Sequence, residues 1–170
     1  MSTLHPPVNE NDHFQGNPEQ AKVILTEYGD YQCPSCAEAD PIVKDLQKYF
    51  GNDLLFVFRN FPLTEMHPDA FNAAVVAEAA AKQDKFWEMH DILYENQNRL
   101  DPEALEYYAE QVGLNTTTFQ RDFQSKELRN KVEADMESGL RSGVNGTPSF
   151  YINGEKYNED WSEEFLKEVL

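Results

Sequence analysis

Two short apolar runs flank a segment with helical periodicity in the first third of the chain. Residues 22–28 and 54–58 are rich in apolar side chains and have the length of buried strands. Between residues 37 and 50 the apolar side chains recur every three or four positions, which predicts a helix with one buried face. Strand, helix and strand with short connections predict a parallel pair joined by a right-handed crossover.

The middle of the chain carries helical signals and no convincing strand. An Ala-rich run at 73–81 has high helix propensity, and Asp101-Pro102-Glu103 is typical of a helix start. We expect one helix starting at residue 68, one over 85–96, one from 101 to a stop at 113, and two over 116–123 and 126–141.

Strand character returns after this helical region. Residues 149–152 form a short apolar run, and Asn153-Gly154 is a strong signal for a tight hairpin turn into residues 155–157. Residues 161–170 have the pattern of a closing amphipathic helix. The order of elements is therefore βαβ, a helical insert, then ββα. This order predicts an α/β, thioredoxin-like fold with an inserted all-helical subdomain.

The same pattern divides the chain into three parts. Residues 1–18 are polar and contain Pro and Gly, so we expect a flexible N-terminal arm. Residues 19–63 and 143–170 form a discontinuous thioredoxin-like domain, and residues 64–142 form the helical insert.

The two cysteines of the chain, Cys33 and Cys36, lie at the turn between the first strand and the first helix. This places Cys33 at or near the N-cap and Pro34 in the first turn, where a missing N–H is tolerated. The free N–H groups and partial positive charge of a helix start stabilise an anion, so they lower the pKa of a thiol. Cys36 lies one turn further on, and the pair predicts a two-electron thiol–disulfide couple.

Two other uses of a cysteine pair are half of a zinc site and inert packing in the core. Zinc requires four ligands, usually from a second cysteine pair or paired histidines. The four histidines are scattered through the sequence without that spacing, so we predict no metal site.

Composition restricts the partners and the location. Lys and Arg number 14 against 31 Asp and Glu, which gives a formal net charge of −17. Such an acidic surface argues against nucleic acid as a partner. The sequence has no stretch of eighteen apolar residues, so we expect no membrane insertion. The N-terminus lacks the features of a signal peptide. We therefore expect a cytoplasmic protein as the sequence is written, or a periplasmic or secreted one if it is a mature form.

Motifs along nearly the whole chain resemble those of the bacterial DsbA-like thiol–disulfide oxidoreductases. They are Phe14-Gln15-Gly16-Asn17-Pro18, Cys33-Pro34-Ser35-Cys36 with the preceding Glu27 to Gln32, Asn60-Phe61-Pro62-Leu63, Phe86-Trp87-Glu88-Met89-His90-Asp91, and Gly143 to Phe150 with Asn153-Gly154.

The resemblance implies roles for individual residues. Cys33 matches the attacking thiolate of the family, and Cys36 matches the resolving thiol. Pro148 matches a cis-proline that lies against the disulfide, and the backbone of Thr147 would pair with a substrate strand. We further expect Cys33 to be the acidic and exposed thiol and Cys36 to be the buried one.

Two features concern how the thiols are tuned. Glu27 is a charged residue in an otherwise apolar strand, and the family carries a buried carboxylate here that tunes the thiols and relays the resolving proton. The alternative is an outward-pointing strand residue.

Strongly oxidising members of the family have His between the cysteines, whereas this chain has Pro34-Ser35 at the helix tip. We therefore expect a weaker oxidant than those members.

The expected function is thiol–disulfide exchange with cysteine-containing proteins, with a separate redox partner that resets the pair. The reaction requires no cofactor beyond the Cys33–Cys36 dithiol. A non-catalytic peptide-binding or holdase module and a glutathione-dependent isomerase or transferase are alternatives on the same fold. The glutathione-dependent branch usually has Ser at the position of the nucleophile, so the intact cysteine pair speaks against it.

Overall fold

A mixed β-sheet with strand order β1-β3-β2-β4-β5 forms the centre of the thioredoxin-like fold. The computed structural model describes residues 2–170; Met1, in the expected arm, and the side chain of Phe165, in the expected closing helix, lie outside it. The strands are β1 (His13–Gln15), β2 (Val23–Gly29), β3 (Leu54–Asn60), β4 (Ser149–Ile152) and β5 (Glu155–Tyr157). The prediction of an α/β, thioredoxin-like fold is confirmed.

The order and direction of the strands bring the first and last thirds of the chain into one sheet. β2 and β3 pair in parallel, as the sequence predicted, and β3 is buried along its whole length. β4 then pairs antiparallel with the other edge of β2 and turns into β5. Asn153 and Gly154 have positive φ angles of 50° and 86°, which is the backbone that a tight hairpin turn requires.

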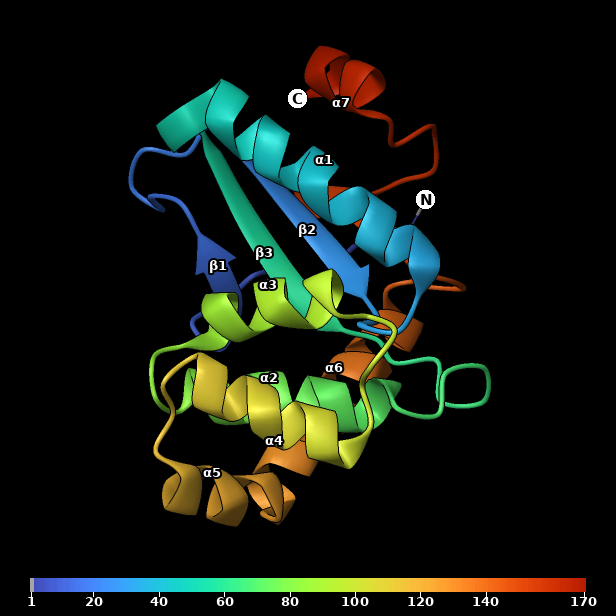
Figure 1. The fold of residues 1–170 in the computed structure, drawn as a ribbon. Helices are drawn as coiled ribbons and strands as arrows, with labels where there is room; N and C mark the ends of the chain where they lie inside the picture. Colours follow the sequence, from blue (N-terminus) through green and yellow to red (C-terminus); the bar gives the residue numbers. More distant parts are fainter. Residues whose placement is uncertain (1) are drawn as a thin grey trace.

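The helices lie on the sheet and beyond its end. They are α1 (Pro34–Phe50), α2 (Ala70–Ala81), α3 (Phe86–Glu95), α4 (Pro102–Gln111), α5 (Thr116–Phe123), α6 (Lys126–Arg141) and α7 (Glu163–Val169), with a short 3-10 turn at Gly51–Asp53. Figure 1 shows α1 crossing the sheet with α7 beside it, and α2, α4 and α5 below the ends of β2 and β3. No helix within residues 2–170 has both the length and the apolar character needed to span a bilayer.

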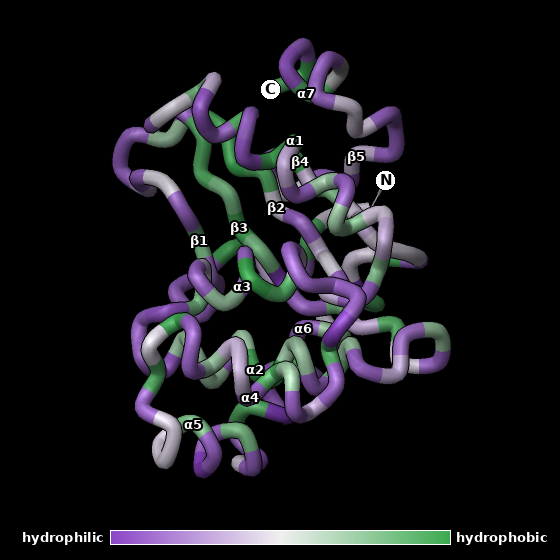
Figure 2. The backbone as a smooth tube through the Cα atoms, in the orientation of Figure 1, coloured by the Kyte–Doolittle hydropathy of each residue, from purple (hydrophilic) through white to green (hydrophobic). Residues whose placement is uncertain are grey.

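The core is continuous between the sheet and the helical region. β2 and β3 supply apolar side chains on one side, and α2 is surrounded by α3, α4, α5 and α6. Because most of α2 is Ala and Val, it can be buried on nearly all sides without leaving polar groups unpaired. Figure 2 shows the same distribution, with hydrophobic residues along β2 and β3 and hydrophilic ones on the outer loops.

The expectation of a flexible arm at residues 1–18 is wrong for the described part of that segment. β1 pairs antiparallel with β3, and Leu4 is buried with its N–H donating to the carbonyl of Gly154 at 2.7 Å. The Asp12 carboxylate accepts hydrogen bonds from Arg59, which is itself buried. The polar residues of this segment satisfy buried groups of the sheet, so their polarity does not indicate disorder. The division into residues 19–63 with 143–170 and residues 64–142 stays a prediction.

Candidate active site

The cysteine pair lies at the start of α1, immediately after the loop that leaves β2. Cys33 is the N-cap residue with an extended backbone (φ −78°, ψ 122°), and Pro34 follows in the first turn. The N–H of Cys33 donates to the carbonyl of Asp30, and the carbonyl of Cys33 accepts from the N–H of Ala37. The predicted placement of Cys33 and Pro34 is therefore confirmed.

The two thiols are free and differ in accessibility. Cys33 is 6% exposed and Cys36 is 0% exposed. The expectation of an exposed Cys33 is therefore corrected: both residues are buried, and Cys33 is the one with a remaining opening to solvent. The loop that carries Thr147 packs against Cys33 and accounts for part of this burial.

The pKa of Cys33 is lowered to about 5. The largest cause is a hydrogen bond from the Cys36 thiol to the Cys33 sulfur, and partial burial opposes it. The backbone N–H groups of Cys36 and Ser35 add further hydrogen bonds to the thiolate, and the nearby Thr147 side chain lowers the pKa of Cys33 further, although its hydroxyl has no hydrogen-bond partner among the described residues. These N–H groups belong to the first turn of α1, so the helix start stabilises the anion in the way that the sequence indicated.

Cys36 is shifted in the opposite direction. Burial raises the pKa of the Cys36 thiol far above its usual value, and the hydrogen bond that it gives to Cys33 and the nearby carboxyl of Glu27 raise it further. At neutral pH the site therefore holds one thiolate and one thiol, with the negative charge on the more accessible sulfur.

Thr147 and Pro148 bring the C-terminal part of the chain to the thiols. The peptide bond between them is cis, as predicted, and the Cys33 thiol donates to the carbonyl of Thr147 at 3.6 Å. The Ser149 hydroxyl donates to the carbonyl of Gly146 at 2.6 Å and closes the loop just before β4.

Glu27 lies inside the sheet rather than at the surface. It is 3% exposed and lies opposite Phe58 on β3 and Phe150 on β4. Its Oε2 atom has no hydrogen-bond partner among the described residues. Burial raises the pKa of Glu27 well above its usual value, with smaller contributions from Asp40 and Cys33. The alternative of an outward-pointing strand residue is therefore wrong.

A polar network holds the loop between β2 and α1. The buried Asp30 carboxylate accepts from the N–H groups of Gln32 and Leu63 and pairs with Nδ1 of His67 at 2.8 Å. Gln97, which follows α3, donates to the carbonyl oxygens of Tyr31 and Cys33. Sequence reasoning missed Gln97, because a glutamine that binds backbone carbonyls belongs to no motif.

A group of possible metal ligands lies between α1, which carries Asp40, and α3, which carries His90 and Asp91. Ligand atoms of Asp40, His90 and Asp91 lie within 4.8 Å of one another. The ammonium group of Lys44 lies 3.2 Å from Asp40 and 3.0 Å from Asp91, and Nδ1 of His90 is bonded to the Tyr31 hydroxyl. The cysteines are not among these residues, so the group offers no completion of a cysteine zinc site.

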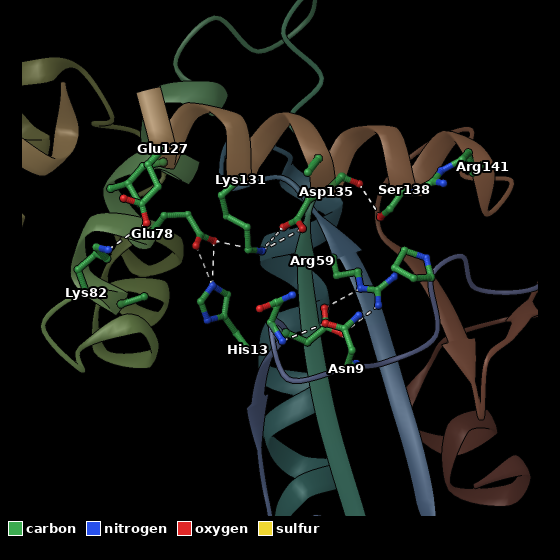
Figure 3. Close-up of a pocket in the computed structure, with 16 residues that line it drawn as sticks. Asn9, His13, Arg59, Glu78, Lys82, Glu127, Lys131, Asp135, Ser138 and Arg141 are labelled. Carbon is green, nitrogen blue, oxygen red and sulfur yellow. Dashed lines mark hydrogen bonds and ion pairs between the residues drawn. The ribbon is translucent and has the colours of Figure 1, made fainter. Parts of the chain in front are cut away.

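A cavity of about 550 Å³ is separate from the thiols. It lies between the N-terminal segment, α2 and α6, and Figure 3 shows Glu78, Lys131 and Asp135 directed toward one another along its wall. Lys131 lies 2.9 Å from Asp135, and His13 lies 2.9 Å from Glu78. None of the predicted site residues lines this cavity.

Comparisons with known proteins agree with this geometry. The thioredoxin family model matches residues 8–170. The chain is 37% identical over 171 residues to the Na(+)/H(+) antiporter NhaA 1 of Mycobacterium sp. (strain KMS), covering 99% of this chain and 28% of that protein. It is 39% identical over 161 residues to NhaA 1 of Salinispora arenicola (strain CNS-205), covering 95% and 24%. The chain thus spans about a quarter of the length of these curated relatives.

Solved structures match almost the whole chain. A thioredoxin-like oxidoreductase from Silicibacter pomeroyi DSS-3 superposes with a TM-score of 0.84 at 27% identity, covering 95% of this chain and 91% of that one. Oxidised BdbD from Bacillus subtilis superposes with a TM-score of 0.86 at 25% identity, covering 99% and 95%. The alpha-DsbA1 of Wolbachia pipientis, with a TM-score of 0.84 at 19% identity and coverage of 97% and 92%, shares the fold.

Proposed function

This chain belongs to the thioredoxin family, and we propose that it catalyses thiol–disulfide exchange with cysteine-containing proteins through Cys33 and Cys36. The main support for the proposal is that two thiols one helical turn apart have pKa values shifted in opposite directions. The pKa of Cys33 is about 5, and that of Cys36 is raised far above its usual value. The structural match to a thioredoxin-like oxidoreductase and to DsbA-type proteins supports the same chemistry.

In the reducing direction, the Cys33 thiolate attacks one sulfur of a substrate disulfide. The substrate S–S bond breaks, a substrate thiolate leaves and takes a proton from solvent, and a mixed disulfide with Cys33 remains. Cys36 then loses its proton and attacks the Cys33 sulfur. The Cys33–Cys36 disulfide forms and the second substrate thiolate leaves, so the substrate gains the two electrons that the dithiol loses. The same steps in reverse oxidise a substrate dithiol.

We assign the Cys36 proton to Glu27. Because Cys36 is fully buried, its proton requires an acceptor inside the protein during the second step. Glu27 is buried near both thiols, and one of its oxygens has no other hydrogen-bond partner among the described residues. Its raised pKa brings it closer to that of a thiol than an exposed carboxyl would be.

Thr147 and Pro148 form the proposed substrate contact. The Thr147 carbonyl is already within 3.6 Å of the Cys33 sulfur, so a peptide that pairs with this backbone would bring its own sulfur next to Cys33. The dithiol itself carries the two electrons, and a separate redox partner would reset it after each turnover. Since Pro34-Ser35 provides no positive charge between the cysteines, we expect a weaker oxidant than relatives with His there.

Reduction of insulin by dithiothreitol tests this function. The protein should shorten the lag before the released insulin chains precipitate, and Cys33→Ser should abolish the effect. Titration of the pair against glutathione buffers should give a two-electron potential and so define the direction. If wild-type protein leaves the lag unchanged and the pair shows no two-electron titration, the chain is not an oxidoreductase. Suppression of aggregation by both the wild type and Cys33→Ser would instead favour a holdase.

A further inference from the structure

The loop that carries the nucleophile is held by Leu63, just before the helical region, and by residues within that region. The Asp30 carboxylate is held by Leu63 and His67, and the side-chain carbonyl of Gln32 accepts from the N–H of Asp69 at 2.8 Å. In addition to the bond between the Tyr31 hydroxyl and His90, the main-chain carbonyls of the two remaining loop residues, Tyr31 and Cys33, both accept from one further side chain.

That side chain is Gln97. Its Nε2 atom lies 3.0 Å from the carbonyl oxygen of Tyr31 and 2.7 Å from that of Cys33. An amide NH₂ group has two hydrogens, so Gln97 uses its full donor capacity on these two carbonyls. In Figure 1 the yellow-green connection that follows α3 runs close to the loop between β2 and α1.

We propose that Gln97 is a positioning residue that fixes the start of α1 so that its N–H groups meet the Cys33 sulfur. The proposal deepens the proposed function, on which it rests. The N-cap residue Cys33 lacks the side-chain oxygen that usually caps a helix, and in the reduced structure it forms no side-chain cap, so its orientation depends on backbone contacts. Its carbonyl accepts from Ala37 at 3.2 Å and from Gln97 at the shorter distance of 2.7 Å.

The two hydrogen bonds from Gln97 act on both sides of the Gln32–Cys33 peptide. They restrain the Tyr31–Gln32 peptide and the Cys33–Pro34 peptide, and so limit the rotation of the Gln32–Cys33 peptide between them. The N–H groups of Ser35 and Cys36 stabilise the thiolate only while the sulfur remains in front of them. Without Gln97 the sulfur would sample positions further from these donors, and the thiolate would lose part of its stabilisation.

The test compares Gln97→Ala and Gln97→Glu with the wild type in the reduced full-length chain. Two quantities are measured: the pH at which the thiolate absorbance of Cys33 appears, and the equilibrium constant for reduction of the Cys33–Cys36 disulfide by glutathione. We expect Gln97→Ala to raise the pH of thiolate formation. It should also make the disulfide about tenfold harder to reduce, which corresponds to about 30 mV for a two-electron couple. Gln97→Glu replaces the two donors by acceptors and adds negative charge, so its effect should be larger.

Gln83→Ala is the matched control. Gln83 is also a glutamine of the helical region that bonds the backbone, donating to the carbonyl of Asn115 and accepting from its N–H. It should leave both thiol measurements unchanged even if it lowers the melting temperature. If Gln97→Ala does not fold, Gln97→Glu decides the question.

The inference is overturned if the folded Gln97 variants keep both quantities within twofold of the wild type, or if Gln83→Ala shifts them equally. These measurements need no protein substrate, so they remain informative even if the insulin assay fails. A shift in both quantities without turnover would support Gln97 as a positioning residue and count against the proposed function alone.

Discussion

The Sγ atom of Cys33 lies 3.6 Å from the carbonyl oxygen of Thr147, although 114 residues separate them in the sequence. The sheet explains this proximity. β4 pairs antiparallel with β2, so that Tyr28 at the end of β2 lies opposite Ser149 at the start of β4. The loop that precedes β4 therefore meets the loop that follows β2. A substrate bound to the first loop would contact the thiolate carried by the second.

Removal of the Thr147 hydroxyl should destabilise the Cys33 thiolate and so raise the pKa of Cys33. Thr147→Val keeps the shape of the side chain but removes the hydroxyl, which has no hydrogen-bond partner among the described residues and is one of the groups that lower the pKa of Cys33 to about 5. Because the hydroxyl is free to turn toward the sulfur once the Cys33 proton leaves, we expect its removal to raise the pKa of Cys33 by up to about one unit, which corresponds to about 1.4 kcal/mol. The measurement is the rate of alkylation by iodoacetamide as a function of pH.

Thr26→Val is the control for this variant. Thr26 is a fully buried threonine on β2 whose hydroxyl, like that of Thr147, has no hydrogen-bond partner among the described residues, but Thr26 is not among the main groups that lower the pKa of Cys33. Its substitution should leave the alkylation profile unchanged. An unchanged profile in Thr147→Val would remove the side chain from the set of groups that stabilise the thiolate.

The unequal thiols should give unequal trapping. With Cys36→Ser, the Cys33 thiolate still attacks a disulfide, but nothing resolves the product, so a stable mixed disulfide should accumulate. With Cys33→Ser, the remaining thiol is fully buried and its pKa is raised, so it should trap almost nothing at neutral pH. Mass spectrometry after exposure to a disulfide-containing peptide measures both. Equal trapping by the two variants would contradict the assignment of Cys33 as nucleophile.

Glu27→Gln should slow the second step of the exchange more than the first. The amide cannot accept the Cys36 proton, whereas the first attack uses a thiolate that is already formed. Rapid-mixing kinetics with a fluorescent disulfide peptide separates the two steps. Glu38→Gln, which changes an exposed carboxyl on α1, is the control and should alter neither step. A second step of wild-type speed in Glu27→Gln would leave this carboxyl without a role in proton transfer.

The raised pKa of Glu27 also predicts how the stability of the protein depends on pH. Burial raises the pKa of Glu27 in the folded protein above the ordinary value of 4.5, so the folded state binds the proton more tightly than the unfolded state. Glu27 therefore lowers the stability of the wild type as the pH rises from 4.5 toward the folded-state pKa. Glu27→Gln lacks this loss. Urea unfolding should show the variant gaining stability relative to the wild type with rising pH, and a difference independent of pH would contradict the raised pKa.

Local signals explain which elements could be predicted from the sequence. α5 and α6 have the predicted bounds because Asn115 and Ser125 cap them through their own side chains. Two runs rich in apolar residues predicted β2 and β3, and Pro34 next to Cys33 predicted that the thiols lie at the start of α1. In each case the residues that specify the element lie within it or next to it.

Features that depend on distant partners could not be predicted in this way. β1 has only three residues, and it forms because β3 offers a free edge more than forty positions away. Gln97 acts on main-chain carbonyls, which every residue possesses, so its sequence position carries no sign of its partner. The polarity of the N-terminal segment predicts an arm for a related reason: its polar residues bind buried groups that only the folded chain brings to them.

The ion pair between Asp12 and Arg59 links the N-terminal segment to β3. Both side chains are buried, and the pair makes two hydrogen bonds at 2.8 and 2.9 Å. Asp12→Asn leaves the buried guanidinium without a neutralising charge, so we expect a loss of about 3 kcal/mol in the free energy of unfolding. Asp53→Asn is the control, because the Asp53–Lys22 pair is exposed and longer at 3.9 Å and should contribute no more than about 1 kcal/mol. Urea denaturation of both variants gives the comparison. Similar small losses would mean that this ion pair contributes little, and that β1 and Leu4 account for the attachment of the segment.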